Sequence, residues 1–181
     1  MKTIFFDTEF DNFADLGLIS IGFYSDCGNY NLYLENLDFK LNRCSDFVKQ
    51  NIIPKLDNQK YGVQQTELKD KFYNWIKGIP DEHLLFLTDY SGDLKIFWKH
   101  FYSYELPKKI TTQHMYDRFS FLLKHNNMME KHNYFMDIFN RNLSKEEDKQ
   151  LIHHSFADAK ANMKAWNHTL ISLGVNHATH I

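Results

Sequence analysis

Residues 83–102 read HLLFLTDYSGDLKIFWKHFY, and this stretch decides the fold. The first six residues form a continuous apolar run, which predicts a central strand buried on both of its faces. The run SGDLKIFWKHFY (91–102) follows directly and predicts a helix. A strand of this kind requires helices on both faces of its sheet, so we expect an α/β protein.

Three further strands are predicted before this stretch. KTIFF (2–6), LGLISIGFY (16–24) and NYNLYL (29–34) have the β-branched and aromatic residues or the alternation typical of strands. The segment DCGN (26–29) is a turn signal between the last two. Because the connections are short, we expect the three strands to form an antiparallel meander.

Helices are predicted in most of the remaining chain. Ser45 is a suitable N-cap for a helix over 43–56, with Pro54 near its end. The last long helix begins near Ser155, carries an apolar stripe and ends at Gly174. The other predicted elements are a helix over 66–79, a short strand over 108–112 and an aromatic- and Met-rich helical region over 114–140. Together these elements indicate a mixed sheet with helices packed on it.

The composition is that of one globular domain covering residues 1–181. Hydrophobic residues make up 43% of the chain and aromatic residues 16%, which excludes a disordered protein. The formal net charge is −2, so binding to a polyanion requires a local basic patch. Acids interrupt the apolar start at once, which excludes a signal peptide, and no apolar run is long enough to span a bilayer. We expect a cytoplasmic protein in which Cys27 and Cys44 are free thiols.

Two acids interrupt the apolar stretch FFDTEF (5–10). Asp7 and Glu9 are two residues apart, which on a strand places both side chains on one face. They lie at the carboxyl end of the predicted strand, where open α/β sheets usually build their sites. Two carboxylates directed at one point repel, so either their pKa values rise or they share a cation. Carboxylate sites suit Mg²⁺ or Mn²⁺, although a solvated strand end would also explain one of these acids.

A second acidic position follows the central strand. Asp93 falls in the first turn of the predicted helix over 91–102, where Ser91 could be the N-cap. Acids favour helix N-termini for dipole reasons alone, which is the alternative explanation of Asp93. Asp89 is a rival for the same role, but Asp93 is better set to project from a helix start over the sheet edge.

The stretch HHSFADA (153–159) is the third motif. Ser155 and Asp158 have the spacing of a capping box, which would explain Asp158 without a site. Asp158 lies off the apolar stripe of its helix, however, and its alanine neighbours would allow close approach to another element. His153 lies just before the helix and could reach the same space as Asp158.

The three motifs together supply four acids and a histidine. The acids Asp7, Glu9, Asp93 and Asp158 are enough to hold two divalent metals about 3.5–4 Å apart, the arrangement used for in-line phosphoryl displacement. One metal would activate a water, and the other would stabilise the leaving 3′ oxygen. A histidine near that water can act as a general base.

In this order, FFDTEF, DYSGD and HHSFADA resemble the three motifs of the histidine-containing branch of the DEDD exonuclease superfamily. The third motif of that branch is His, four residues, then Asp-Ala, which selects His153 rather than His154. The sequence is most similar to a compact single-domain 3′–5′ exoribonuclease family typified by a mycobacterial enzyme. The similarity covers roughly residues 1–100 and 150–170, and residues 105–148 lie outside it. It departs from the pattern at Gly92, where a bulkier residue is more usual, and at Ser155-Phe156, which replaces Ala-Leu.

The resemblance implies a ribonuclease H-like fold and removal of nucleotides from 3′ ends with two Mg²⁺ or Mn²⁺ ions. The four acids would be the metal ligands, and His153 the general base. Thr8 and Phe10 would border the terminal nucleotide, and Phe10 could stack on a base, although core packing would explain it equally well. The expected substrates are single-stranded 3′ ends, with RNA favoured over DNA. A homodimer is also expected, because related compact exonucleases are often dimers.

Other interpretations stay open at this stage. The lysine pairs Lys95 with Lys99 and Lys108 with Lys109 are candidate contacts to the nucleic-acid backbone, although a solvated face is the more common role of such pairs. The chain could act mainly on DNA, or be a catalytically silent nucleic-acid-binding module of the same fold. It could also be an interaction protein that uses residues 105–148 as its contact surface.

Overall fold

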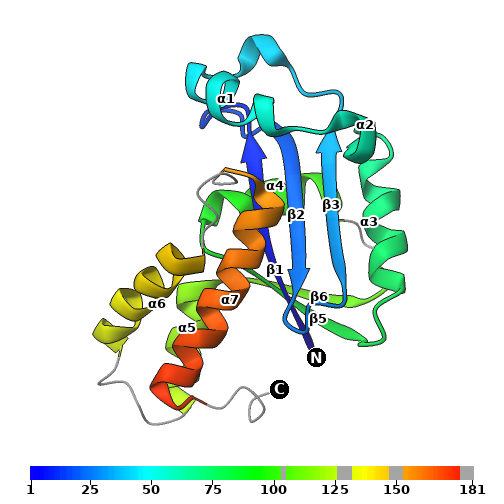
Figure 1. Ribbon diagram of the computed structural model, residues 1–181. Helices are drawn as coiled ribbons and strands as arrows, with labels where there is room; N and C mark the ends of the chain where they lie inside the picture. The colour runs from blue at the N-terminus through cyan, green and yellow to red at the C-terminus, as the bar shows by residue number, and fades with distance from the viewer. Residues whose placement is uncertain (103–104, 126–131, 147–152, 176–181) are drawn as a thin grey trace.

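A six-stranded mixed sheet runs through the computed structural model, which describes residues 1–102, 105–125, 132–146 and 153–175 (Figure 1). The strand order is β4-β3-β2-β1-β5-β6. β1, β2 and β3 form an antiparallel meander, whereas β5 runs parallel to β1, β6 to β5 and β4 to β3. The strands are β1 (Lys2–Phe10), β2 (Leu18–Ser25), β3 (Asn31–Asn36), β4 (Gly62–Val63), β5 (His83–Thr88) and β6 (Lys109–His114). The predicted α/β class with a mixed sheet is therefore confirmed, and the arrangement is consistent with a ribonuclease H-like fold.

Helices cover both faces of this sheet. α3 and α4 pack on one face, and α5, α6 and α7 pack on the other, so that the sheet separates two apolar cores. Figure 1 shows α7 crossing in front of β1 and β2. The helices are α1 (Asp46–Asn51), α2 (Asn58–Tyr61), α3 (Leu68–Lys77), α4 (Ser91–Phe101), α5 (Met115–His125), α6 (His132–Glu146) and α7 (Ser155–Leu173), with short 3₁₀ turns at Leu41–Arg43 and Ile53–Lys55.

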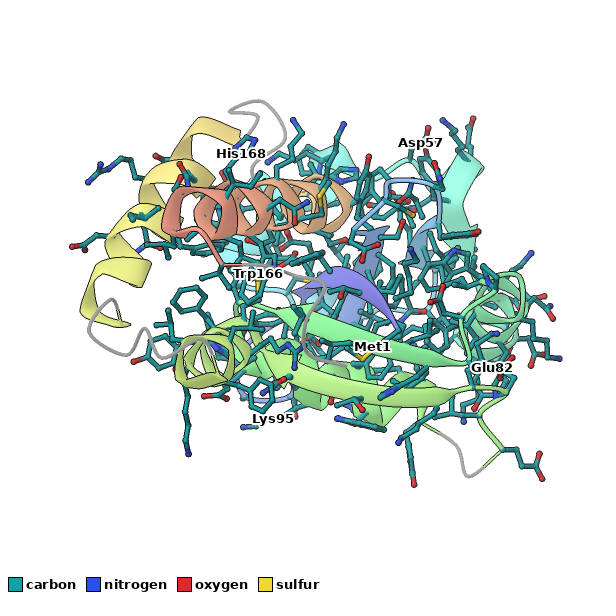
Figure 2. All side chains as sticks on the ribbon, turned by 90° about the horizontal axis from the view of Figure 1, so that it is seen from below. Met1, Asp57, Glu82, Lys95, Trp166 and His168 are labelled. Atoms are coloured by element: carbon teal, nitrogen blue, oxygen red, sulfur yellow. The ribbon has the colours of Figure 1, made fainter. Side chains whose placement is uncertain are left out.

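β1 contributes to both cores because it lies between β2 and β5. Successive side chains of a strand point to opposite faces, so Phe5 and Phe6, both fully buried, enter different cores. Phe6 packs on Phe97 of α4, with 5.4 Å between the ring centroids. Phe5 packs on Trp166 of α7 at 6.2 Å, and Figure 2 shows Trp166 between that helix and the sheet. The parity of β1 thus decides which of its residues face α7.

The predicted strands and the last helix are found with small shifts of their ends. β1 continues to Phe10 instead of ending at residue 6, so that Asp7 and Glu9 lie inside it. The predicted end of α7 is confirmed, because Gly174 follows it in the left-handed conformation with φ of 67°. β4, α2 and the 3₁₀ turn at Leu41–Arg43 were not predicted.

The helix predicted over 43–56 is shorter than expected. Ser45 is its N-cap, as predicted, and its side chain accepts a hydrogen bond from the Val48 N–H at 3.2 Å. α1 ends at Asn51, and Pro54 lies at the start of the following 3₁₀ turn, where its missing N–H is tolerated. The single helical region predicted over 114–140 is α5 and α6, and residues 126–131 within it lie outside the described residues.

Two predicted caps are wrong. Ser91 and Ser155 are the first residues inside α4 and α7, and the N-caps are Tyr90 and His154, which make no side-chain capping bond. The Ser155 hydroxyl instead lies 3.0 Å from that of Ser20 on β2. The capping-box explanation of Asp158 therefore fails.

Both cysteines are free thiols. Cys27 is exposed and Cys44 is buried, and they form no disulfide. Within the described ranges, no helix combines the length and the apolar character that crossing a membrane would require.

Candidate active site

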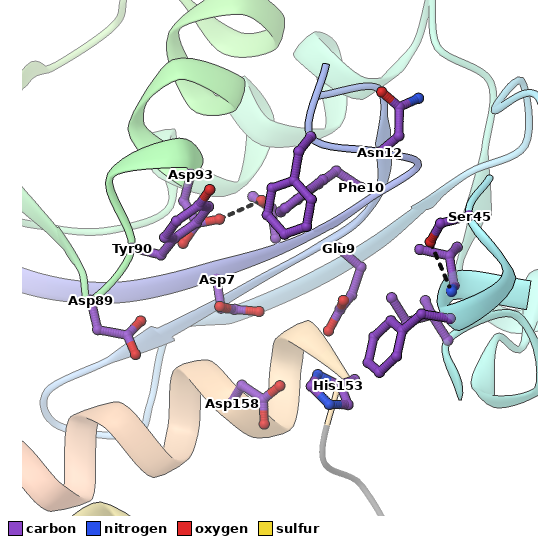
Figure 3. A pocket seen from close by; sticks show the side chains of 15 residues that line it. Asp7, Glu9, Phe10, Asn12, Ser45, Asp89, Tyr90, Asp93, His153 and Asp158 are labelled. Carbon is purple, nitrogen blue, oxygen red and sulfur yellow. Dashed lines mark hydrogen bonds between the residues drawn. The ribbon is translucent and has the colours of Figure 1, made fainter. Parts of the chain in front are cut away.

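The carboxyl half of β1 supplies the first two acids. Asp7 and Glu9 have the same parity as Phe5, so they face α7, as their spacing predicted (Figure 3). The register of the pairing with β2 shifts between Glu9 and Phe10, at the end of the strand. Glu9 is only 8% exposed, and no described residue donates a hydrogen bond to the carboxylate of Glu9 or of Asp7. These two acids are therefore available to another partner.

α7 brings Asp158 to the same place. Asp158 lies in the first turn of α7, and Gly22 pairs with Asp7 across β1 and β2. A Cβ added to Gly22 would lie 2.3 Å from the Cα of Phe156, so the start of α7 can approach the sheet only because residue 22 has no side chain. This contact explains how Asp158, at the far end of the chain, reaches Asp7.

The end of β5 contributes two more acids. β5 runs parallel to β1, with Leu87 beside Phe5, so the chain leaves β5 close to Asp7. Asp93 on α4 is 1% exposed, and its two carboxylate oxygens accept hydrogen bonds from the hydroxyls of Thr8 and Thr88, each at 2.6 Å.

Asp89 follows β5 directly and keeps partial access to solvent. Its Oδ1 accepts a hydrogen bond from Asn162 Nδ2 of α7 at 2.8 Å. The sequence favoured Asp93 over Asp89 as the acid that follows the central strand, but the structure brings both of them to Asp7.

The five carboxylates form two groups that share one member. Oxygens of Asp7, Glu9 and Asp158 lie within 4.8 Å of one another, and so do oxygens of Asp7, Asp89 and Asp93. A group of three carboxylates is an all-oxygen donor set of the kind that Mg²⁺ and Mn²⁺ prefer. The buried acidic residues could therefore bind a metal ion in each group, with Asp7 common to both.

Burial and mutual repulsion control the protonation of this cluster. Burial raises the pKa of Asp7 well above its usual range, and the charges of Asp93 and Glu9 raise it further. Burial also raises the pKa of Glu9 to about 8, with Asp158 adding to the effect and Lys55 opposing it. The pKa of Asp93 rises to about 7 through burial, although the two threonine hydroxyls lower it. Divalent cations would relieve this repulsion, so the residues fit such ions.

The two histidines before α7 have different surroundings. His153 has a positive φ of 63°, contacts the ring of Phe47 edge-on at 4.9 Å and lines the cavity beside the acids. His154 instead stacks on Tyr33, with 4.6 Å between the ring centroids, and it is not among the residues that line this cavity. Of the two, the structure therefore places His153 beside the carboxylates (Figure 3).

A cavity of about 720 Å³ lies over the acids, and part of its wall is aromatic. Phe10 and Tyr90 lie nearly parallel, at 14° with 6.1 Å between their centroids, and Phe13 contacts Phe10 edge-on. Phe13 is 79% exposed and Phe47 is 50% exposed, and both line this cavity together with Phe10 and Tyr90, which groups exposed apolar surface as binding sites do. Of these residues the sequence had indicated only Phe10. The F-x-x-F spacing directly after Glu9 was the available signal for Phe13, and none pointed to Phe47.

The sequence also predicted substrate contacts for Thr8 and for two lysine pairs, and of these only Thr8 lines the cavity. Thr8 lines the cavity, but its hydroxyl donates a hydrogen bond to Asp93 at 2.6 Å. Lys95, Lys99, Lys108 and Lys109 are not among the residues that line the cavity. Lys99 donates a hydrogen bond to the backbone carbonyl of Asp15 at 3.3 Å.

Comparisons with models of known protein families and with curated protein sequences found no match to this chain.

Proposed function

We propose that the protein is a metal-dependent 3′–5′ exonuclease that hydrolyses phosphodiester bonds at single-stranded 3′ ends, with RNA favoured. The observation that carries the proposal is that Asp7 is shared by two groups of three carboxylates, beside a cavity with an aromatic wall. The motif resemblance that first suggested this activity supports the same interpretation, because it selected Asp7, Glu9, Asp93 and Asp158 as the acids of the site.

The acids would hold two divalent ions. Asp7, Glu9 and Asp158 would hold one ion, and Asp7 with Asp93 would hold the other. Such a pair of ions supplies an activated water and charge stabilisation at phosphate and leaving oxygen. Glu9 fits this role because it is 8% exposed, accepts no hydrogen bond from a described residue and faces the cluster.

The protein's own groups would bind the strand end and move the proton. His153 would accept a proton from the attacking water as the new P–O bond forms and the bond from phosphorus to the 3′ oxygen breaks. The products would be a nucleoside 5′-monophosphate and a strand with a new 3′ hydroxyl. Nucleobases would stack on the aromatic wall. Such stacking is tolerant of sequence and requires unpaired bases.

The direct test is digestion of 5′-labelled single-stranded RNA and DNA in Mg²⁺ or Mn²⁺. We expect stepwise shortening from the 3′ end, faster on RNA, that stops on addition of a chelator. Asp7→Ala should abolish shortening because it removes a ligand common to both ions, whereas Asp70→Ala, on the exposed side of α3, should leave it unchanged.

The proposal is wrong if neither substrate is shortened in either metal by the folded protein. Tight binding of RNA without turnover would instead indicate a catalytically silent binding module. Shortening of DNA alone would keep the exonuclease and overturn the preference for RNA.

A further inference from the structure

Asp89 is an acid that the proposed chemistry does not require but that the structure holds at the cluster. It lies directly after β5, and a carboxylate oxygen of Asp89 is within 4.8 Å of oxygens of Asp7 and Asp93. Figure 3 shows its side chain directed toward the space that Asp7 and Asp158 face. Asp89 lines both the cavity of about 720 Å³ and a smaller one of about 140 Å³ on its α7 side. Its carboxylate is thus open to ions and water from two directions.

Two contacts outside the cluster hold Asp89 in this position. Asn162, which is 2% exposed on α7, donates its amide N–H to Asp89 Oδ1 at 2.8 Å. The imidazole of His114, at the end of β6, hydrogen-bonds the Asp89 backbone carbonyl through Nε2 at 2.7 Å. An amide that hydrogen-bonds a carboxylate oxygen, as Asn162 does here, is typical of the partners that surround metal ligands.

Asp93 differs from Asp89 in how its charge is already compensated. Both oxygens of Asp93 accept short hydrogen bonds from threonine hydroxyls, so part of its capacity is used inside the protein. The only side-chain hydrogen bond that Asp89 accepts from another described residue is the one from Asn162. Asp89 therefore keeps more of its capacity for a cation.

We propose that Asp89 is a direct ligand of the second divalent cation, together with Asp7 and Asp93, and that Asn162 positions its carboxylate. This inference rests on the proposed function and adds a fifth acid to the four that the sequence motifs indicate. With Asp89 included, three carboxylates would bind the second ion. They should bind it more tightly than Asp7 and Asp93 alone.

Calorimetric titration of the full chain with Mn²⁺ tests this assignment without relying on activity. We expect the unaltered protein to bind two ions. Asp89→Asn should weaken the binding of the second ion at least about a hundredfold and leave the binding of the first ion unchanged. Asn162→Ala should weaken the binding of the second ion about 10- to 100-fold, as is typical of residues that orient a metal ligand. Asp70→Asn makes the same chemical change on an exposed face of α3 and should bind both ions normally.

The outcomes separate this assignment from the exonuclease proposal. If Asp89→Asn binds two ions with unchanged affinity, Asp89 is not a ligand, whether or not the protein digests RNA. If the unaltered protein binds no second ion, the assignment also fails. If two ions bind and Asp89→Asn loses one, but no nucleic acid is digested, the assignment stands and the exonuclease proposal fails. Thermal melting of metal-free Asp89→Asn should show no loss of stability, because the change removes one repelling charge.

Discussion

At the scale of single residues, the site depends on groups that differ sharply from their immediate neighbours in the sequence. His153 and His154 are adjacent, yet only His153 lines the cavity beside the acids, while His154 packs on Tyr33. The left-handed backbone at His153 accounts for this difference, because it turns the chain just before α7 begins. The role of His153 as general base is a prediction that follows from this placement.

His153→Ala should slow digestion of single-stranded RNA by about 10²- to 10⁴-fold, the usual contribution of a general base. Binding of Mn²⁺ should be unchanged, because His153 belongs to neither carboxylate group. The matched variant is His154→Ala, which should keep most of the activity and lose some stability through its packing on Tyr33. If His154→Ala is the variant that stops digestion, the assignment of the base is wrong.

The exposed aromatic residues offer a second test at this scale. Phe13→Ala should raise KM for single-stranded RNA about tenfold, since a stacked base contributes about 1–3 kcal/mol. The stability of the protein should hardly change, because Phe13 is 79% exposed. Phe121 is a matched control, as a phenylalanine on α5 that is 40% exposed and does not line the cavity. An unchanged KM for Phe13→Ala would remove the aromatic wall from the binding site.

At the scale of elements, the contact between β2 and the start of α7 assembles the site. Gly22 faces the backbone of Ser155 and Phe156, and the hydroxyls of Ser20 and Ser155 meet across the same contact. Two residues along β1 from Asp7, Glu9 pairs with Ser20. The position of Asp158 relative to Asp7 and Glu9 therefore depends on how closely α7 packs on β2.

Gly22→Ala should force α7 away from the sheet, because the added Cβ would overlap backbone atoms that cannot rotate aside. We expect a loss of about 1–3 kcal/mol in the free energy of unfolding, measured by urea denaturation. The first Mn²⁺ site should weaken as well, since Asp158 moves with α7. Gly78→Ala is the control, because its Cβ would meet only the Trp75 carbonyl, at 3.3 Å, and it should cost clearly less. Equal effects of the two substitutions would contradict this account of the contact.

At the scale of the whole molecule, the buried acids make the metal-free protein sensitive to pH. The pKa of Glu9 rises from 4.5 to about 8 and that of Asp93 from 3.8 to about 7 on folding. Between these limits the folded protein holds protons that the unfolded chain has lost. The free energy of unfolding of the metal-free protein should therefore fall as the pH rises from about 4 to 8.

Thermal melting at pH 6 and pH 8, with and without Mg²⁺, checks this behaviour. Without metal, the melting temperature should be lower at pH 8, and Asp7→Asn should reduce the difference. With saturating Mg²⁺ the stability should recover, and the gain should be larger at pH 8, where the carboxylates are free of protons. A metal-free protein that is more stable at pH 8 than at pH 6 would contradict the assigned shifts.

The alternation along β1 and the apolar run of β5 were enough to predict both strands and the common side of Asp7 and Glu9. Local patterns decide such features, because the direction of a side chain follows from its position in a strand or helix. The same reasoning failed at Ser155. The spacing of a capping box is also a local pattern, but in the structure His154 is the N-cap of α7. The Ser155 hydroxyl instead hydrogen-bonds that of Ser20 on β2, a strand distant in the sequence.

By itself, the sequence determined the class of fold, the order of its main elements and four of the five acids at the cluster. It chose Asp93 over Asp89, although the structure brings both to Asp7, and it did not show that Phe47 lines the same cavity as Phe10 and Tyr90. Those features join residues that are far apart in the chain, and their distances depend on the packing of whole elements. The parallel pairing of β5 with β1, and the absence of a side chain at Gly22, bring these residues together. The tertiary structure alone decided that Asp7 belongs to two groups of carboxylates at once.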